Sequence, residues 1–168
     1  MKYAKKIAFL GIMLALIIVL TIFENMLPPI PLLPPNIKIG LSNIIIMYLV
    51  FFTGYREAIL LNVLKSLFVF VTRGGMSGIL SFSGGMVSVI IIIILILIFK
   101  DNISYIAVSI AGAISHNFAQ LLVYSLIMST NLLVIHLPAL LVFGIIVGAA
   151  TGFLLQKLLP VLNKLEKL

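Results

Sequence analysis

Residues 84–99 read GGMVSVIIIIILILIF, a run of sixteen residues that contains no charged side chain and is mostly isoleucine and leucine. An uncharged apolar run of this kind indicates a helix whose solvent is the hydrocarbon of a membrane. Sixteen residues are fewer than the roughly 20 that a full crossing requires. Flanking residues, or a tilted or re-entrant segment, must therefore complete the span.

Five further apolar runs accompany it, at residues 7–23, 39–52, 58–72, 103–128 and 132–159. The whole chain is 63% hydrophobic and 9% charged, whereas an ordinary soluble domain is about 45–50% apolar and about 25% charged. At about 20 residues per span, 168 residues accommodate these six runs and leave no room for a separate soluble domain. We therefore expect an all-α bundle of six transmembrane helices, with residues 1–168 forming a single transmembrane domain.

The distribution of lysine and arginine predicts how the bundle is oriented. The net charge of +7 comes from cations scattered singly at the ends of apolar runs, which does not indicate a nucleic-acid partner. Loops that are rich in lysine and arginine stay in the cytoplasm. Both termini are therefore expected on the cytoplasmic side of a bacterial-type cell membrane. Eight cations then lie inside and two outside: Lys2, Lys5, Lys6, Arg56, Lys100, Lys157, Lys164 and Lys167 against Lys38 and Arg73.

Two segments are expected to depart from helical structure. Residues 24–38 form the first outer loop and contain five prolines, which hold a chain extended, so the loop is either a semi-rigid cap or a plain external linker. Residues 73–85 carry so many glycines that we predict an irregular backbone there. Non-helical backbone at membrane depth is tolerated only beside protein or water. This glycine-rich segment should therefore border a cavity.

Catalytic chemistry has little support in the sequence. The acidic residues are only four, and all of them fall at expected span ends or in tails: Glu24, Glu57, Asp101 and Glu166. Magnesium-dependent prenyl or phosphoryl chemistry needs clustered carboxylates, and a hydrolytic triad needs an acid that orients its histidine. The chain also lacks cysteine, so thiol chemistry is excluded. We expect a protein that is not an enzyme and that requires neither a metal nor a cofactor.

A polar stripe occupies one side of the fifth expected span. His116, Gln120 and Tyr124 recur at four-residue spacing, and Asn117 adjoins them. Because residues four apart lie on the same helix face, these side chains should point in one direction. Polar groups within a membrane are functional candidates by default. The stripe predicts contact with a polar ligand, although interhelical hydrogen bonds that merely hold the bundle together would give the same pattern.

Lys65 stands near the middle of the third expected span, on one face with Asn62 and Ser66. A lysine at this depth must meet an anion, extend to an interface or lose its proton. We expect no carboxylate within the spans to neutralise it, which favours an anionic ligand group. Snorkelling or pairing with carbonyl groups is the alternative, because this span is short. Further polar residues are expected to complete an outward-facing pocket: Asn43, Arg73, Ser81 and Ser83.

Small residues form two strips that indicate close helix packing. Gly144, Gly148 and Gly152 are spaced by four in the last span and are expected to pack within the molecule. The first span carries a second strip, near the cytoplasm, which is available to a partner helix: Ala4, Ala8, Gly11 and Ala15.

Residues 40–44, 83–88, 112–121 and 137–141 together resemble the Gx transporter family, often labelled heptaprenyl diphosphate synthase component I. The most specific of these segments is GAISHNFAQL at 112–121. The family is in turn similar to the S components of energy-coupling factor (ECF) transporters. The resemblance implies a six-helix protein that captures a vitamin-like solute from outside and docks on an ATP-driven module through a small-residue strip on its first helix.

Two functions follow from these features. The first is a substrate-binding membrane component of a transporter, which captures a small, anionic or amphipathic solute of a vitamin-like or isoprenoid-like kind. The second is a non-catalytic accessory subunit of isoprenoid or quinone biosynthesis, or of flavin-linked membrane redox metabolism. The second function predicts lipid tails between helices in place of an enclosed polar pocket. A purely structural role is disfavoured by the free energy required to place Lys65 and His116 in a membrane.

Overall fold

The computed structural model describes residues 3–26, 40–129 and 132–166. In these residues it contains α-helices joined by short turns, together with a single turn of 3-10 helix at Lys100–Asn102. The α-helices are α1 (Tyr3–Met26), α2 (Asn43–Phe52), α3 (Tyr55–Arg73), α4 (Gly75–Phe99), α5 (Tyr105–Ile127) and α6 (Leu132–Glu166). Their number and order confirm the predicted all-α bundle of six helices.

Four helices are long and apolar enough to cross a membrane: α1, α4, α5 and the Ile135–Lys164 part of α6. The length and apolar composition of these helices therefore indicate a multi-pass membrane protein. The ten residues of α2 extend about 15 Å, roughly half of the hydrocarbon thickness. The nineteen-residue α3 is long enough, but it contains the charged residues Arg56, Glu57, Lys65 and Arg73. Crossing by all six helices therefore remains a prediction.

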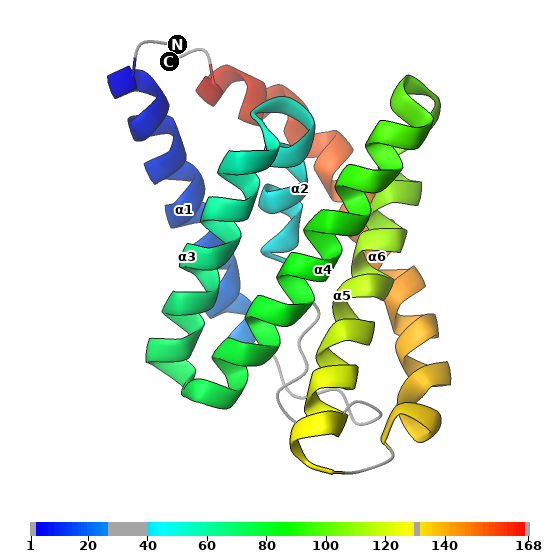
Figure 1. Cartoon of the computed structure of the whole chain (residues 1–168). Coiled ribbons are helices and arrows are strands. Elements are labelled where there is room, and N and C mark those ends of the chain that lie inside the picture. Colours follow the sequence, from blue (N-terminus) through cyan, green and yellow to red (C-terminus); the bar gives the residue numbers. More distant parts are fainter. Residues whose placement is uncertain (1–2, 27–39, 130–131, 167–168) are drawn as a thin grey trace.

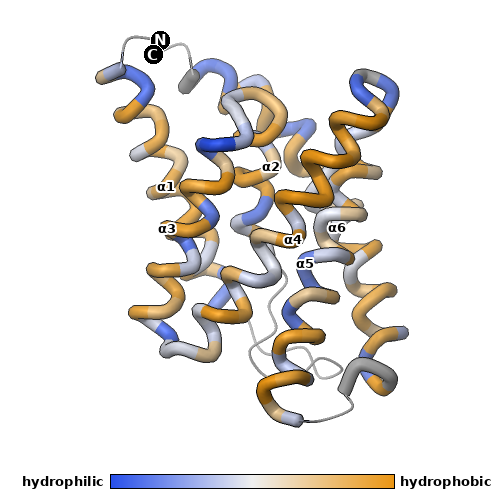
Figure 2. Tube along the Cα trace, viewed as in Figure 1, coloured by the Kyte–Doolittle hydropathy of each residue, from blue (hydrophilic) through white to orange (hydrophobic). Residues whose placement is uncertain are grey.

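The short helix α2 lies at the centre of the bundle, in contact with α1, α3, α4 and α6 (Figure 1). Seven successive residues of this helix, 44–50, are buried, so it has no exposed face. The surrounding helices are apolar on their outer surfaces, and Figure 2 shows hydrophilic positions at helix ends and within α3 and α5. A short helix is compatible with a membrane environment here because other helices surround it.

Two side-chain contacts join helices at one end of the bundle. The start of α1 and the end of α6 lie at the same end (Figure 1). At that end the Lys6 ammonium group forms an ion pair with Glu57, which joins α1 to α3. The Tyr48 hydroxyl also donates to the Asn163 side chain over 3.1 Å, which joins α2 to α6. The orientation of this end toward the cytoplasm stays a prediction.

The prediction of an irregular backbone at residues 73–85 is wrong, because α4 is helical from Gly75 onward. Only Gly74, with φ +87°, breaks the helical path, and it forms the turn between α3 and α4. The glycines inside α4 serve close packing. A Cβ on Gly78 would lie 2.7 Å from the Phe70 Cα, and one on Gly84 would lie 2.7 Å from the Gln120 side chain. Close helix packing outweighs the weak helix propensity of glycine.

The expected boundary of the first outer loop also needs correction. Glu24 belongs to α1, which continues to Met26, and its side chain is buried. The proline-rich segment, with Lys38, lies outside the described residues.

The glycine strip of α6 packs within the molecule, as predicted. Gly144, Gly148 and Gly152 face the α5 backbone at Ile114, Ile110 and Ile106, respectively. A Cβ on Gly148 would lie 2.5 Å from the Ile110 Cα, so the two helices touch through their main chains. This contact fixes where α5 places its polar face.

The Gly148→Ala variant should lower the free energy of unfolding by about 1–3 kcal/mol, because the added methyl group meets backbone atoms that cannot turn aside. Denaturant unfolding of the purified protein in detergent measures this change. The matched control is Gly11→Ala in α1, where an added Cβ meets nothing within 4 Å. Equal stability of the two variants would contradict the close α5–α6 contact.

Candidate functional site

A chain of hydrogen bonds links three helices in the interior. The Lys65 ammonium group on α3 donates to Asn43 Oδ1 at the start of α2 over 2.7 Å. The Asn43 Nδ2 atom lies 3.1 Å from His116 Nδ1 on α5. The His116 ring also lies against Gly84 on α4, where an added Cβ would be 2.9 Å from His116 Cε1. Four helices therefore meet at one set of polar side chains.

The chemistry of Asn43 determines the direction of this chain. An amide nitrogen can only donate, so Nδ1 of His116 must accept and the proton of the neutral ring must reside on Nε2. The amide oxygen of Asn43 accepts from the lysine in the same arrangement. Lys65 is only 4% exposed and His116 only 2%. Two of the residues that the sequence singled out are therefore held by a third, Asn43, which the sequence also predicted.

The backbone before α2 brings Asn43 into place. Gly40 adopts φ +84°, and its carbonyl oxygen accepts from the Asn43 N–H over 2.9 Å. A Cβ on Gly40 would lie 2.8 Å from Asn43 Nδ2, so a larger residue would displace the amide. The Gly40 N–H in turn donates to the Glu24 carboxylate, which ties the end of α1 to the start of α2.

The polar chain borders a small cavity of about 30 Å³ near the end of the bundle opposite the start of α1. A space of this size holds one or two water molecules and no larger solute. Side chains from α1, α3, α4 and α5 line it together with Gly40: Thr21, Glu24, Asn25, Lys65, Val69, Arg73, Ser77, Ser81, His116 and Gln120.

Glu24 corrects the expectation that no carboxylate lies near Lys65. Its side chain is 4% exposed and lines the same cavity as Lys65. The sequence placed Glu24 in the first outer loop, because the first apolar run ends at Phe23. A signal was nevertheless present, because Glu24 follows Ile17 and Thr21 at the spacing of one helix face, and that face is buried. Thr21, Asn25 and Ser77 were missed as well.

The cavity collects only part of the predicted set. Lys65, Arg73, Ser81, His116 and Gln120 line it. Arg73 donates to the Asn25 side chain over 2.9 Å. The Gln120 Oε1 atom is buried and has no hydrogen-bond partner among the described residues.

The remaining predicted residues lie away from this cavity. Asn62 is buried against Gly85, and its amide atoms find no partner in the described part of the chain. Ser83 donates to the Leu80 carbonyl oxygen of its own helix. Asn117 is buried and Tyr124 half-buried, but neither lines the cavity. Of the polar stripe on α5, His116 and Gln120 therefore line the cavity and Tyr124 does not.

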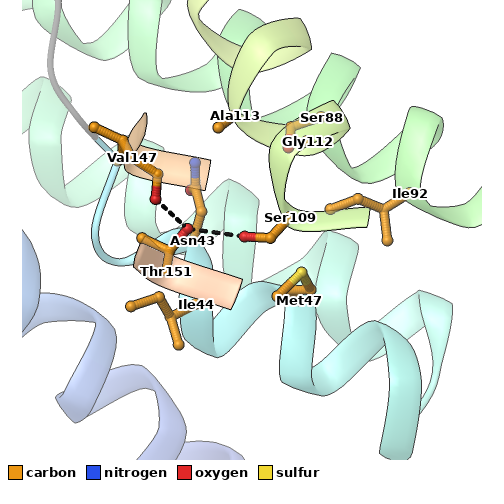
Figure 3. Close-up of a pocket in the computed structure, with 11 residues that line it drawn as sticks. Asn43, Ile44, Met47, Ser88, Ile92, Ser109, Gly112, Ala113, Val147 and Thr151 are labelled. Atoms are coloured by element: carbon orange, nitrogen blue, oxygen red, sulfur yellow. Dashed lines mark hydrogen bonds between the residues drawn. The ribbon is translucent and has the colours of Figure 1, made fainter. Parts of the chain in front are cut away.

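A second cavity, of about 20 Å³, lies on the other side of Asn43 between α2, α4, α5 and α6 (Figure 3). The Ser109 and Thr151 hydroxyl groups are 2.8 Å apart at its edge, and Thr151 also donates to the Val147 carbonyl oxygen. Gly40 lines both cavities. Asn43 lines this second cavity and forms hydrogen bonds with Lys65 and His116, which line the first.

A family model described as heptaprenyl diphosphate synthase component I matches residues 13–158. This chain belongs to the heptaprenyl diphosphate synthase component I family. The match includes every residue that lines the two cavities. No curated protein and no solved structure matches the chain. The family predicted from the sequence is thus confirmed, whereas the similarity to ECF S components stays a prediction.

The small-residue strip of this family member lies on an open face of α1. Ala4, Ala8, Gly11 and Ala15 are all exposed. The family match begins at residue 13, so only Ala15 of the strip falls within it. The strip is geometrically available to another helix.

The Asn43→Leu variant should lose about 1–3 kcal/mol of stability, because the Lys65 ammonium group and His116 Nδ1 would both lose a buried partner. Denaturant unfolding in detergent measures the loss. The control is Ser83→Ala, which removes only a local bond to Leu80 and should change stability by less than about 0.5 kcal/mol. Unchanged stability of the Asn43 variant would show that the polar chain is not maintained.

Proposed function

We propose that this protein is the substrate-binding membrane component of a transporter, similar to ECF S components, and that it captures a small, anionic or amphipathic solute. The observation that carries the proposal is the buried Lys65 ammonium group, held by Asn43 beside the cavity. A cation inside an apolar bundle destabilises the protein unless polar or anionic groups compensate its charge. An anionic group of a transiently bound ligand would be such a partner.

The charges around the cavity support an anionic group on the ligand. Of the described residues that line the cavity, two carry cationic side chains, Lys65 and Arg73, and one carries a carboxylate, Glu24. One positive charge is therefore left over among the ionised lysine, arginine and glutamate side chains that line it. The Gln120 Oε1 atom, which has no partner among the described residues, offers an acceptor, so the same ligand should also carry a hydrogen-bond donor.

Uptake from outside fits the position of the cavity. The cavity lies toward the end of the bundle opposite the start of α1. If both termini are cytoplasmic, as the cation distribution predicts, that end faces outward. Because the cavity holds only water-sized groups, the bundle must widen when a solute enters. Displacement of the Asn43 amide would provide part of the room.

ATP-driven transport would require a partner, because the sequence contains no nucleotide-binding motif. We propose an energy-coupling module, consisting of a transmembrane scaffold and ATPases, that docks on the exposed strip of α1. The chain itself would bind and release its solute without catalysis.

The Lys65→Met variant should lose the solute that co-purifies with the wild-type protein from native membranes, by about tenfold or more, because the cation in the cavity is removed. Mass spectrometry of small molecules bound to the gently purified protein measures the loss. The matched control is Lys157→Met, which removes an exposed lysine of α6 that lies over the Phe153 ring. Equal solute content in the two variants would remove Lys65 from the binding site.

The Gly11→Leu variant should abolish co-purification of the ATPase module, because the added side chain prevents close approach of a partner helix. Quantitative mass spectrometry of the proteins retained by the tagged chain measures this. The control is Val142→Leu on an exposed position of α6, which should retain the module. Retention by both variants would refute docking on the strip, without bearing on solute binding.

A non-catalytic accessory subunit of isoprenoid or quinone metabolism is the second candidate. It is favoured by an open apolar groove of about 280 Å³ between α3 and α4, far larger than the polar cavity. The groove is lined mainly by aliphatic and aromatic side chains: Val63, Leu67, Phe70, Ile79 and Phe82. A prenyl lipid or quinone in the purified protein, together with biosynthetic or redox enzymes and with no polar solute, would support this function over transport.

A further inference from the structure

A cleft of about 480 Å³ opens at the end of the bundle that contains the start of α1. We call it the α4 cleft; its lining residues are Phe51, Tyr55, Ile96, Leu97, Lys100, Ile103 and Tyr105. It is separate from the polar cavity, with which it shares no residue. Neither of the functions proposed above uses it.

The path of α4 produces this cleft. Gly78 and Gly85 allow α4 to pack tightly against Phe70 and Asn62 of α3 in its first half. Farther along, Ile92 packs against Gly112 of α5. The last turns of α4 therefore follow α5 and diverge from α3, as Figure 1 shows. The result is a wedge-shaped space between the α2–α3 turn and the end of α4.

One wall of the α4 cleft is a cluster of aromatic rings. The Phe51 and Tyr105 rings meet edge to face at 4.9 Å, and the Phe52 ring lies 6.2 Å from that of Tyr105. Tyr48 stacks on Phe52 at 5.1 Å and is itself fully buried. Ring contacts of this kind stabilise the wall of the cleft.

The polar groups of the cleft suit an anionic headgroup. Lys100 is exposed and is the only charged side chain among the described residues that line the cleft. Tyr55 and Tyr105 add two phenol groups, which are the side chains typical of a membrane–water interface. An ammonium group with neighbouring hydroxyl donors can bind a phosphate diester.

An exposed apolar face continues from the cleft along α4. Leu97 lines the cleft and is 59% exposed, and Ile94 and Ile90 follow it on the same face at 44% and 46%. Acyl chains would cover these side chains in a bilayer. A soluble anion would not contact this apolar face, whereas an amphipathic lipid would contact both the face and Lys100.

We propose that the α4 cleft is a binding site for an anionic phospholipid, whose phosphate contacts Lys100 and the two tyrosines and whose acyl chains lie along Ile90, Ile94 and Leu97. Loss of the cation should weaken the preference for anionic over zwitterionic lipid by about fivefold.

The chain contains no tryptophan, so the Ile94→Trp variant introduces a single reporter beside the cleft. The reporter protein is placed in vesicles of phosphatidylcholine and phosphatidylglycerol in which one of the two lipids is brominated. Brominated phosphatidylglycerol should quench the emission more strongly than brominated phosphatidylcholine. Adding Lys100→Gln should remove most of this difference, and adding Lys157→Gln, the matched control on α6, should leave it.

Two quenching results would overturn the proposal. One is equal quenching by the two brominated lipids in the reporter protein. The other is an equal loss of preference with either glutamine variant, which would assign the effect to the general charge of this end. Native mass spectrometry of the protein without the reporter supplies an independent reading: the wild type and Lys157→Gln should retain phosphatidylglycerol, and Lys100→Gln should retain about fivefold less. Absence of retained phosphatidylglycerol in the wild type would also refute the site.

Discussion

The arrangement of the interior depends on the buried ammonium group of Lys65. An apolar bundle cannot hold such a group without polar partners, and its partner is a side chain at the start of α2, Asn43. Because Asn43 also binds His116, the position of α2 is tied to α3 and α5 at once. A helix of ten residues, roughly half as long as the hydrocarbon layer is thick, is thereby held in the centre of the bundle.

Glycine packing makes this arrangement possible. The polar groups can reach one another only if the helices approach closely, and the glycines of α4 and α6 remove the side chains that would prevent it. Gly84 illustrates both roles, because an added Cβ would lie 2.7 Å from the Gln120 side chain and 2.9 Å from the His116 ring. Small residues in this protein therefore position a polar site as well as packing helices together.

The sequence predicted the six helices and the family, because long apolar runs and family-specific segments are strong signals. It also singled out Lys65, Asn43 and His116, which the structure brings together, and their role in ligand binding stays a prediction. It failed where packing overrides propensity: the glycines of residues 75–85 indicated an irregular segment, and their contacts with α3 and α5 make it a helix. It also missed Glu24, because a boundary drawn at the end of an apolar run hid a residue that continues the buried face of α1.

The polar cavity is enclosed by helices, whereas the apolar groove between α3 and α4 opens on the outside of the bundle, and this difference affects their sizes. A polar cavity large enough for a solute would have to be filled with water when empty, whereas helices that close on one another satisfy the polar groups directly, as Lys65 and Asn43 do. Apolar grooves on the outside need no such closure, because lipid fills them. The volume of about 30 Å³ therefore does not by itself decide between the two proposed functions, although the apolar groove is larger. Charge distinguishes the two spaces: Lys65, Arg73 and Glu24 line the small cavity, whereas the described residues that line the groove include no charged side chain.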